Sequence, residues 1–512
     1  MTGATIDAIS DIPSSEEELD CYSGLYSSRA RVCRPRDVEE LRRLFAHAKE
    51  AGRRVTLRAG GHCFDAQALG EDLVISLERL DEIEVREDEE KIRVGPGATW
   101  GAILARLEPL GLVPAVTVTT ANATAGGTLS GDCLSRFSPA YGKEGTRIES
   151  FELLTPQGDL LVCTAPRDGD PRTPEERAWY GAIGGLGYLG AIVSITYRLL
   201  SVRDARGRIG VQTIVRKRRT FTDLAKELVP ATKQTYEEDS DPNDPRKLDA
   251  IYSALYTRGD GSRYALMFTS AFAPEEHRRR LLIHRPRHLF RLPVEWLMRV
   301  RAVNGVLWRL YFRRLAEGDE YVDDLAGYTF FMDGNVRAKR VARRLGIKLK
   351  MVQQTFVVPS DPGAEGGWDK ARDDLVEWLD FTHEFLRERN LTPTLHDVLF
   401  LPADLPFHLS AGADLAGFAV TYAFETSRKR QIERVKQAFS DLADVLWERF
   451  RGRVYLVKNV CATKATLASM YGDNAVEFFR LKRELDPDGV LRNEFLERTF
   501  GDLVGAGAAT PA

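Results

Sequence analysis

The sequence predicts an α+β fold with two domains. Its 512 residues exceed what a single hydrophobic core usually serves, so two domains are expected. In the first 200 residues, short strand and helix patterns follow one another without the regular spacing of βαβ units, which argues against a doubly wound sheet. After residue 203 the chain becomes richer in charge and in long helical patterns, which marks the second domain.

The composition narrows the functional classes. Hydrophobic residues make up 43% and charged residues 29%, as in a soluble globular protein. A formal net charge of −3 argues against a general nucleic-acid partner. The first thirty residues are acidic and polar and no long apolar run occurs, so a cytoplasmic location is expected. The six cysteines form no CxxC pair, so neither a disulfide scaffold nor a metal site is predicted.

The first domain reads as alternating short elements. Apolar residues at helical spacing follow Asp37, and the Asp37 side chain is expected to cap that helix. The expected elements, in order, are a helix at 37–52, strands at 54–57, 73–77 and 91–94, a helix at 99–110 ended by Gly111, and a hairpin of strands 148–155 and 160–164.

Two glycine clusters carry the chemical signal. Arg58-Ala59-Gly60-Gly61-His62-Cys63-Phe64 follows the strand at 54–57, and its glycines let the backbone turn tightly and approach a bulky anionic group. His62 stands at the tip of that turn, where a ring nitrogen can face a bound cofactor. The second cluster, at 124–131, follows about sixty residues later.

A third glycine run at 184–190 contains a formal GxGxxG. A dinucleotide fingerprint needs a strand before it and a helix after it. Here a helical piece at 174–183 precedes the run and a strand at 191–199 follows, so a nicotinamide site is not favoured.

The second domain contains an unusual basic segment at 277–314, with eleven arginines and one acid, Glu295. It is either the solvated face of a helix pair or a surface for a phosphorylated or lipid-linked substrate or an anionic membrane. Further on, a strand at 355–358, a helix at 369–387 and a final helix at 475–485 are expected, and the last dozen residues are expected to be disordered.

The motifs occur in an order that resembles the vanillyl-alcohol-oxidase (PCMH-type) family of FAD-linked oxidases. The resembling pieces are Arg58–His62, the cluster at 124–131, Tyr141-Gly142, the stretches 153–158 and 184–194, and Asp486-Pro487-Asp488-Gly489. Within the family the chain resembles the aldonolactone and alditol oxidases and, in its second half, decaprenylphosphoryl-ribose oxidase. The resemblance implies a discontinuous FAD-binding domain of two subdomains (1–203 and 453–512) and a cap domain (204–452) with an antiparallel sheet flanked by helices.

The same resemblance implies a set of site residues. FAD is the expected cofactor, attached by an 8α-histidyl bond to His62. The residues expected to bind it are Arg58, Ala59, Gly60, Gly61, His62, Cys63, Phe64, Thr119, Thr120, Thr124, Gly126, Gly127, Ser130, Gly131, Gly190 and Ile192.

Lys458 is the expected base or oxyanion partner, because a lysine after the apolar residues 454–457, read as a strand, is costly to bury unless it is paired or catalytic. A surface lysine is the alternative. Tyr455 is expected to donate a hydrogen bond into the same pocket or to pack in the core. Gln353 and Thr421 are expected to contact substrate, although Thr421 stands where the ribose oxidase has a cysteine.

The expected function is oxidation of an alcohol of a sugar, polyol or sugar-bearing metabolite by hydride transfer to flavin N5, with O2 or another carrier as electron acceptor. One alternative is a natural-product tailoring oxidase that acts on C–C or C–N bonds. Others are a sterol-reductase-like NADPH-dependent enzyme and a non-catalytic membrane or partner-binding module built on 277–314.

Overall fold

The computed structural model describes residues 9–167, 169–202, 209–237, 247–257, 263–273, 317–318, 320–330, 332–333, 350–403 and 405–505. The basic segment 277–314 lies outside these residues, so both of its interpretations stay predictions. No helix in the described ranges is long and apolar enough to cross a membrane.

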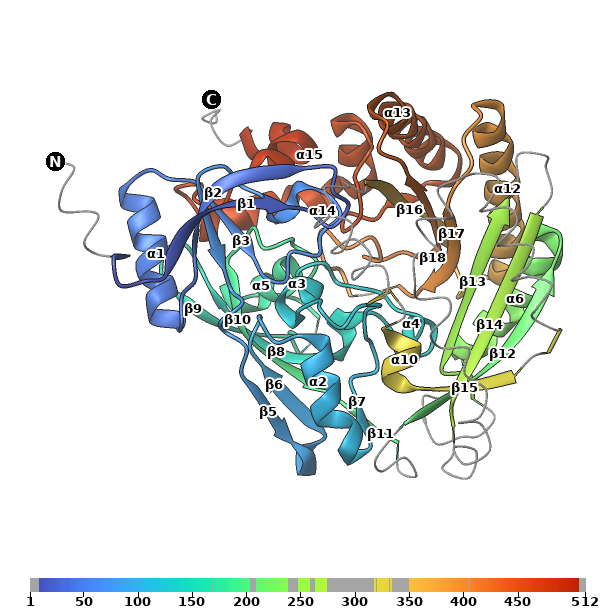
Figure 1. Cartoon of the computed structure of the whole chain (residues 1–512), viewed down its shortest axis with the longest axis horizontal. Coiled ribbons are helices and arrows are strands. Elements are labelled where there is room, and N and C mark those ends of the chain that lie inside the picture. Colours follow the sequence, from blue (N-terminus) through green and yellow to red (C-terminus); the bar gives the residue numbers. More distant parts are fainter. Residues whose placement is uncertain are drawn as a thin grey trace.

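Two small sheets build the N-terminal half (Figure 1). The first has the order β1-β2-β4-β3, with parallel β2–β4 and β4–β3 pairs. The second is antiparallel, with the order β5-β6-β10-β8-β9. Their bounds are β1 Ser14–Asp20, β2 Ser27–Cys33, β3 Val55–Arg58, β4 Leu73–Ser76, β5 Ile83–Arg86, β6 Lys91–Val94, β8 Ile148–Leu154, β9 Leu160–Thr164 and β10 Ala191–Arg198.

Short helices connect these strands, and the predicted elements are confirmed with small shifts at their ends. Asp37 caps α1 by accepting from the Glu40 amide, and Gly111 (φ 70°) closes the turn after α2. The bounds are α1 Val38–Glu50, α2 Trp100–Leu107, α3 Ala125–Leu129, α4 Ser138–Tyr141 and α5 Pro174–Ala182, with the strand pair β7 Leu112–Val113 and β11 Leu200–Ser201.

The second half is one large sheet with strand order β15-β12-β14-β13-β17-β18-β16-β19, and every pairing in it is antiparallel. Helices α6, α12 and α13 cover the face turned away from the N-terminal half (Figure 1). The strands are β12 Gly210–Arg218, β13 Ala250–Thr257, β14 Arg263–Ala273, β15 Glu320–Asp324, β16 Met351–Ser360, β17 Leu395–Leu401, β18 Ala416–Glu425 and β19 Arg453–Val454, and the helices are α6 Phe221–Glu237, α10 Leu325–Thr329, α12 Gly367–Glu388 and α13 Lys429–Val445.

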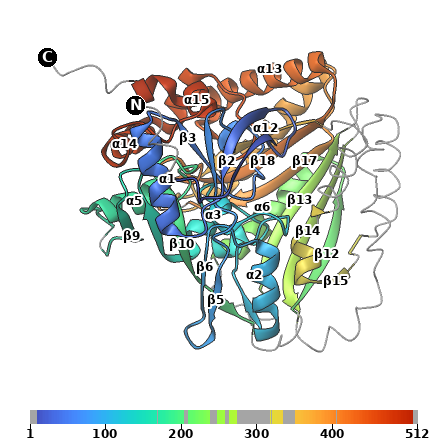
Figure 2. The same ribbon diagram turned by 60° about the vertical axis from the view of Figure 1, so that its left-hand side comes forward.

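The chain then returns to its beginning. Helices α14 (Lys464–Leu485) and α15 (Glu494–Gly505) lie beside the first sheet (Figure 2), and Leu491 bridges to Val55 of β3. The predicted helix at 475–485 is therefore the second part of a longer helix that is kinked at Gly472 (φ 42°).

Two predictions for this return are wrong. Residues 501–505 are helical rather than disordered, because buried Phe495, Leu496 and Phe500 anchor α15 to the core. The apolar stretch 454–457 is not a strand: β19 ends at Val454, and the following residues form a loop.

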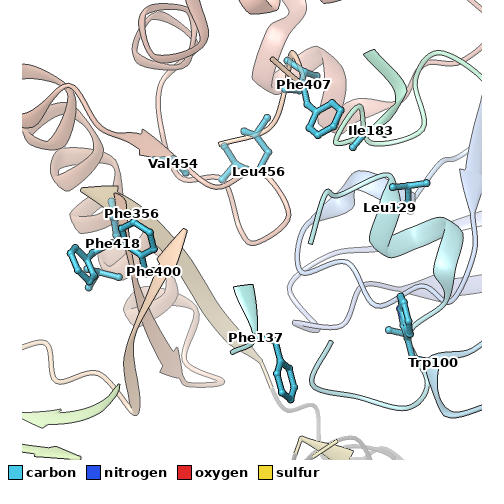
Figure 3. Close-up of a cluster of buried hydrophobic side chains, with 14 of the residues drawn as sticks. Trp100, Leu129, Phe137, Ile183, Phe356, Phe400, Phe407, Phe418, Val454 and Leu456 are labelled. Atoms are coloured by element: carbon cyan, nitrogen blue, oxygen red, sulfur yellow. The ribbon is translucent and has the colours of Figure 1, made fainter. Parts of the chain in front are cut away.

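One hydrophobic core continues through both halves. Figure 3 shows part of it, with Trp100 and Leu129 from the N-terminal half and Phe356, Phe400 and Phe418 from the large sheet. Leu456, on the loop after β19, belongs to the same core and lies between the two groups (Figure 3). This continuity fixes the loop against both halves of the molecule.

Candidate functional site

A cavity lies between the two glycine clusters and encloses about 1180 Å³ of empty space, part of it open to solvent. Lys458 and all sixteen residues expected to hold the cofactor lie on its wall. The sixteen are Arg58, Ala59, Gly60, Gly61, His62, Cys63, Phe64, Thr119, Thr120, Thr124, Gly126, Gly127, Ser130, Gly131, Gly190 and Ile192.

The Arg58 side chain packs against the backbone of the His62 turn at Gly61. Gly61 has φ +65°, a left-handed conformation that favours glycine, and a Cβ there would come within 2.2 Å of the Arg58 guanidinium. That guanidinium donates to the carbonyl oxygens of Ala68 (3.1 Å) and Asp20 (3.2 Å). Arg58 therefore shapes the turn, a role that the sequence did not reveal.

The two glycine clusters are hydrogen-bonded to each other. The Gly60 amide donates to the Thr124 hydroxyl at 3.0 Å, which closes one end of the cavity. Beside it, the Thr120 hydroxyl, which was expected to help bind the cofactor, instead donates to Asp333 at 2.8 Å.

The imidazole of His62 is oriented within its own turn. Its Nδ1 lies 2.8 Å from the carbonyl oxygen of Gly60 and must donate to it, because a carbonyl only accepts. This tautomer places the nucleophilic lone pair on Nε2. The ring of Tyr22 stacks on the imidazole with centroids 5.8 Å apart.

Lys458 places an amine on the same wall. Its Nζ lies 4.1 Å above the centre of the Phe64 ring, and within the described part of the chain it makes no hydrogen bond or ion pair. Burial lowers the pKa of Lys458, while the nearby Cys133 and Asp397 side chains favour the charged form.

Asp397 is a site residue that the sequence reasoning missed. It lies on β17 directly opposite Thr421 of β18, and Thr421 lies opposite Thr355 of β16. Burial raises the pKa of Asp397 to about 6, and the Thr421 hydroxyl and the positive charge of Lys458 oppose that rise. The sequence did contain a sign of this residue: Asp397 is the one acidic residue in Leu395–Leu401, a stretch that is apolar except for Asp397 and His396.

The three side chains form a chain of hydrogen bonds. The Thr421 and Thr355 hydroxyl oxygens are 2.9 Å apart. The Thr421 hydroxyl donates its hydrogen bond to the Asp397 carboxylate, so the Thr355 hydroxyl must donate to the Thr421 oxygen. These hydrogen bonds end at the Asp397 carboxyl group, which lies close enough to Lys458 to interact with its charge.

Two further predicted site residues are buried and make hydrogen bonds to residues outside the cavity wall. Buried Tyr455 donates its hydroxyl to the carbonyl oxygen of Asp132 at 3.0 Å, so it packs in the core, as its alternative interpretation expected. The backbone amide of buried Gln353 donates to the side-chain oxygen of Asn459, and its carbonyl oxygen accepts from the Asn459 backbone amide, both at 2.8 Å. Neither residue, nor Thr421, lines the cavity between the glycine clusters.

Known families match both ends of the chain. The FAD binding domain family matches residues 30–164, and the D-arabinono-1,4-lactone oxidase family matches residues 419–499. Both matches are consistent with the PCMH-type family of FAD-linked oxidases. Its matched residues include both glycine clusters in the first region and Lys458 in the second.

Curated relatives in this FAD-linked family are similar over part of their length. An FAD-dependent monooxygenase, macF, of Penicillium terrestre is 27% identical over 41% of the chain and 38% of the relative. Cytokinin dehydrogenase 9 of Oryza sativa subsp. japonica is 26% identical over 36% of the chain and 38% of the relative. Decaprenylphosphoryl-beta-D-ribose oxidase of Mycolicibacterium smegmatis is 25% identical over 38% of the chain and 42% of the relative. The matches thus span about two fifths of each relative.

The cavity fits the FAD of this family. The amides of Gly61, Cys63 and Phe64 donate to no acceptor in the parts of the chain that are described, and all three residues lie on the wall. Apolar side chains, among them Val118, Leu186 and Ile192, supply a surface for a flat ring system. The two glycine clusters would hold the cofactor, which supplies a hydride acceptor.

Proposed function

We propose that the protein oxidises an alcohol of a sugar, polyol or sugar-bearing metabolite with FAD as hydride acceptor. The observation that carries this proposal is that Lys458 lies on the same cavity wall as the His62 turn, with the buried Asp397 carboxyl close enough to interact with its charge. Alcohol oxidation removes a hydride from carbon and a proton from oxygen, so the site needs a proton acceptor beside the flavin.

In this proposal Asp397 accepts the hydroxyl proton, and the Lys458 ammonium stabilises the negative charge that develops on the substrate oxygen. Thr421 orients the carboxylate through its hydroxyl. Bound FAD would supply the acceptor for the hydride and its two electrons, so that the alcohol would become a carbonyl compound. The proposed final electron acceptor is O2 or another carrier, and the proposed location is the cytoplasm.

The His62 imidazole is the proposed point of covalent attachment through Nε2, because its Nδ1 is engaged with Gly60. Acid precipitation of the purified chain tests this. The yellow colour should remain with the protein pellet, whereas the His62→Ala variant should release its flavin to the supernatant. Colour released from both proteins would show that the cofactor is not attached through His62.

The reaction itself is tested by anaerobic mixing of the holoprotein with polyols, aldonolactones and phosphorylated or lipid-linked sugars. Loss of the flavin's visible absorbance with at least one alcohol supports the proposal. Absorbance that no alcohol changes, but that NADPH removes, would instead favour a reductase.

A second candidate is a tailoring oxidase that acts on C–C or C–N bonds. Its support is that the curated relatives include proteins named FAD-dependent monooxygenases. The same anaerobic assay separates the two, since this candidate should leave the flavin oxidised with every sugar alcohol.

A further inference from the structure

The loop that carries Lys458 is bonded to the segment that follows His62. Gln67 donates its side-chain amide to the carbonyl oxygens of Leu456 (2.8 Å) and Lys458 (3.1 Å). Asn459 donates to the carbonyl oxygen of Phe64 at 2.8 Å. The separation between the imidazole and the amine is therefore set by contacts between residues 64–67 and 456–460.

A buried carboxylate lies at the centre of these contacts. Asp65 is 1% exposed and accepts from the amides of Ala66 (2.7 Å) and Val460 (3.1 Å). A buried carboxylate is costly unless a positive charge compensates it. Arg498 supplies that charge.

Arg498 comes from α15, outside the cavity wall. One of its nitrogens pairs with Asp65, and another donates to the carbonyl oxygen of Val460 at 3.2 Å. The guanidinium therefore binds both segments at once. Asp65 lies three residues after His62, and Val460 lies two residues after Lys458. A lysine could pair with Asp65 but has no planar fork to hold both partners.

We propose that Arg498 is a positioning residue that sets where Lys458 stands relative to the flavin. The inference rests on the proposed function, because it needs a flavin bound at the His62 turn. When the guanidinium is removed, the carbonyl oxygen of Val460 loses its donor and Asp65 lacks its counter-ion. The Lys458 loop then loses its register against residues 64–67, and the amine moves away from the reactive edge.

The probe is inorganic sulfite, which adds reversibly to flavin N5 and removes the visible absorbance without any need for the substrate. A positive charge near the flavin stabilises the anionic adduct, so Lys458→Met should weaken sulfite binding. We expect Arg498→Gln to weaken it about tenfold, the size of coupling that such contacts transmit. Arg498→Lys should recover part of the loss.

The control is Arg492→Gln, which removes the ion pair with Glu497 beside the same helix; both arginine side chains are 35% exposed. This variant should bind sulfite like the wild type. If Arg498 acts through Lys458, Arg498→Gln should add little to the loss already caused by Lys458→Met.

Sulfite affinity unchanged by Arg498→Gln, or a loss that is fully additive with that of Lys458→Met, would overturn the inference. If Arg498→Gln does not fold, Arg498→Lys and its double variant with Lys458→Met decide by the same two criteria. A wild-type chain that binds no flavin would refute the proposed function itself, a different failure from either.

Discussion

The side-chain amide of Asn459 donates to the carbonyl oxygen of Phe64 at 2.8 Å, which joins the lysine loop to the histidine turn. The same side chain accepts from the Gln353 amide at 2.8 Å, so it also ties both to strand β16. Asn459 is 1% exposed. One buried amide thus connects three segments that are far apart in the sequence.

We expect Asn459→Ala to lower the free energy of unfolding by about 1–3 kcal/mol, because two buried backbone groups lose their partners. Chemical denaturation of the holoprotein measures this. Asn459→Asp is the matched variant: it keeps an acceptor for Gln353 but presents a second oxygen to the Phe64 carbonyl. It should therefore remain destabilised, and wild-type stability in both variants would contradict the role assigned to this amide.

The rate of flavin reduction by substrate should fall as the pH drops below about 6. Burial raises the pKa of Asp397 to about 6, and only the ionised carboxylate can accept the hydroxyl proton. Below that pH the rate should decline about tenfold per pH unit. Stopped-flow reduction across pH 4–8 gives the profile. Asp397→Asn should be slow and lack this limb, so an unchanged limb in that variant would assign it to another group.

Much of the cavity wall was predictable because its signals are local. A glycine needed for a turn, or for close approach, is needed whatever the rest of the chain does, and the two glycine clusters carry this signal in a few adjacent residues. The pairing of Asp397 with Lys458 has no such signal. It depends on the register of β17 against β18 and on the course of the loop after β19.

The loop after β19 shows why one expectation failed. Apolar residues at 454–457 suit a buried strand by composition. The carbonyl oxygen of Leu456 instead accepts from the side chain of Gln67, and the Leu456 side chain is buried in the common core. Burial alone does not distinguish a strand from a well-anchored loop.

Adjacent glycines in α3 should respond differently to alanine. A Cβ at Gly126 would lie 2.5 Å from the Cβ and 2.9 Å from the Cα of Pro96, so the helix start must shift. At Gly127 the nearest atom is the Thr124 hydroxyl oxygen, at 3.3 Å. We expect Gly126→Ala to destabilise the chain by about 1–3 kcal/mol. Gly127→Ala should cost far less, as measured by thermal unfolding, and equal effects would refute the close packing of Gly126 on Pro96.

His396 should make the protein less stable in acid. It lies 2% exposed beside Tyr422, and within the described residues neither of its ring nitrogens has a hydrogen-bond partner. Burial lowers its pKa from 6.5 to about 3, so between those values the unfolded chain binds a proton that the folded chain does not. Stability should therefore decrease as the pH falls through this window, by up to about 1.4 kcal/mol per pH unit.

The variant His396→Phe removes this proton and fills the same apolar space. Its free energy of unfolding should be equal to or above that of the wild type at pH 7, since no unbonded ring nitrogen remains buried. The advantage should grow as the pH falls from 6 to 4, which urea unfolding at each pH measures. An advantage that stays constant with pH would mean that His396 takes up its proton in the folded state as readily as in the unfolded chain.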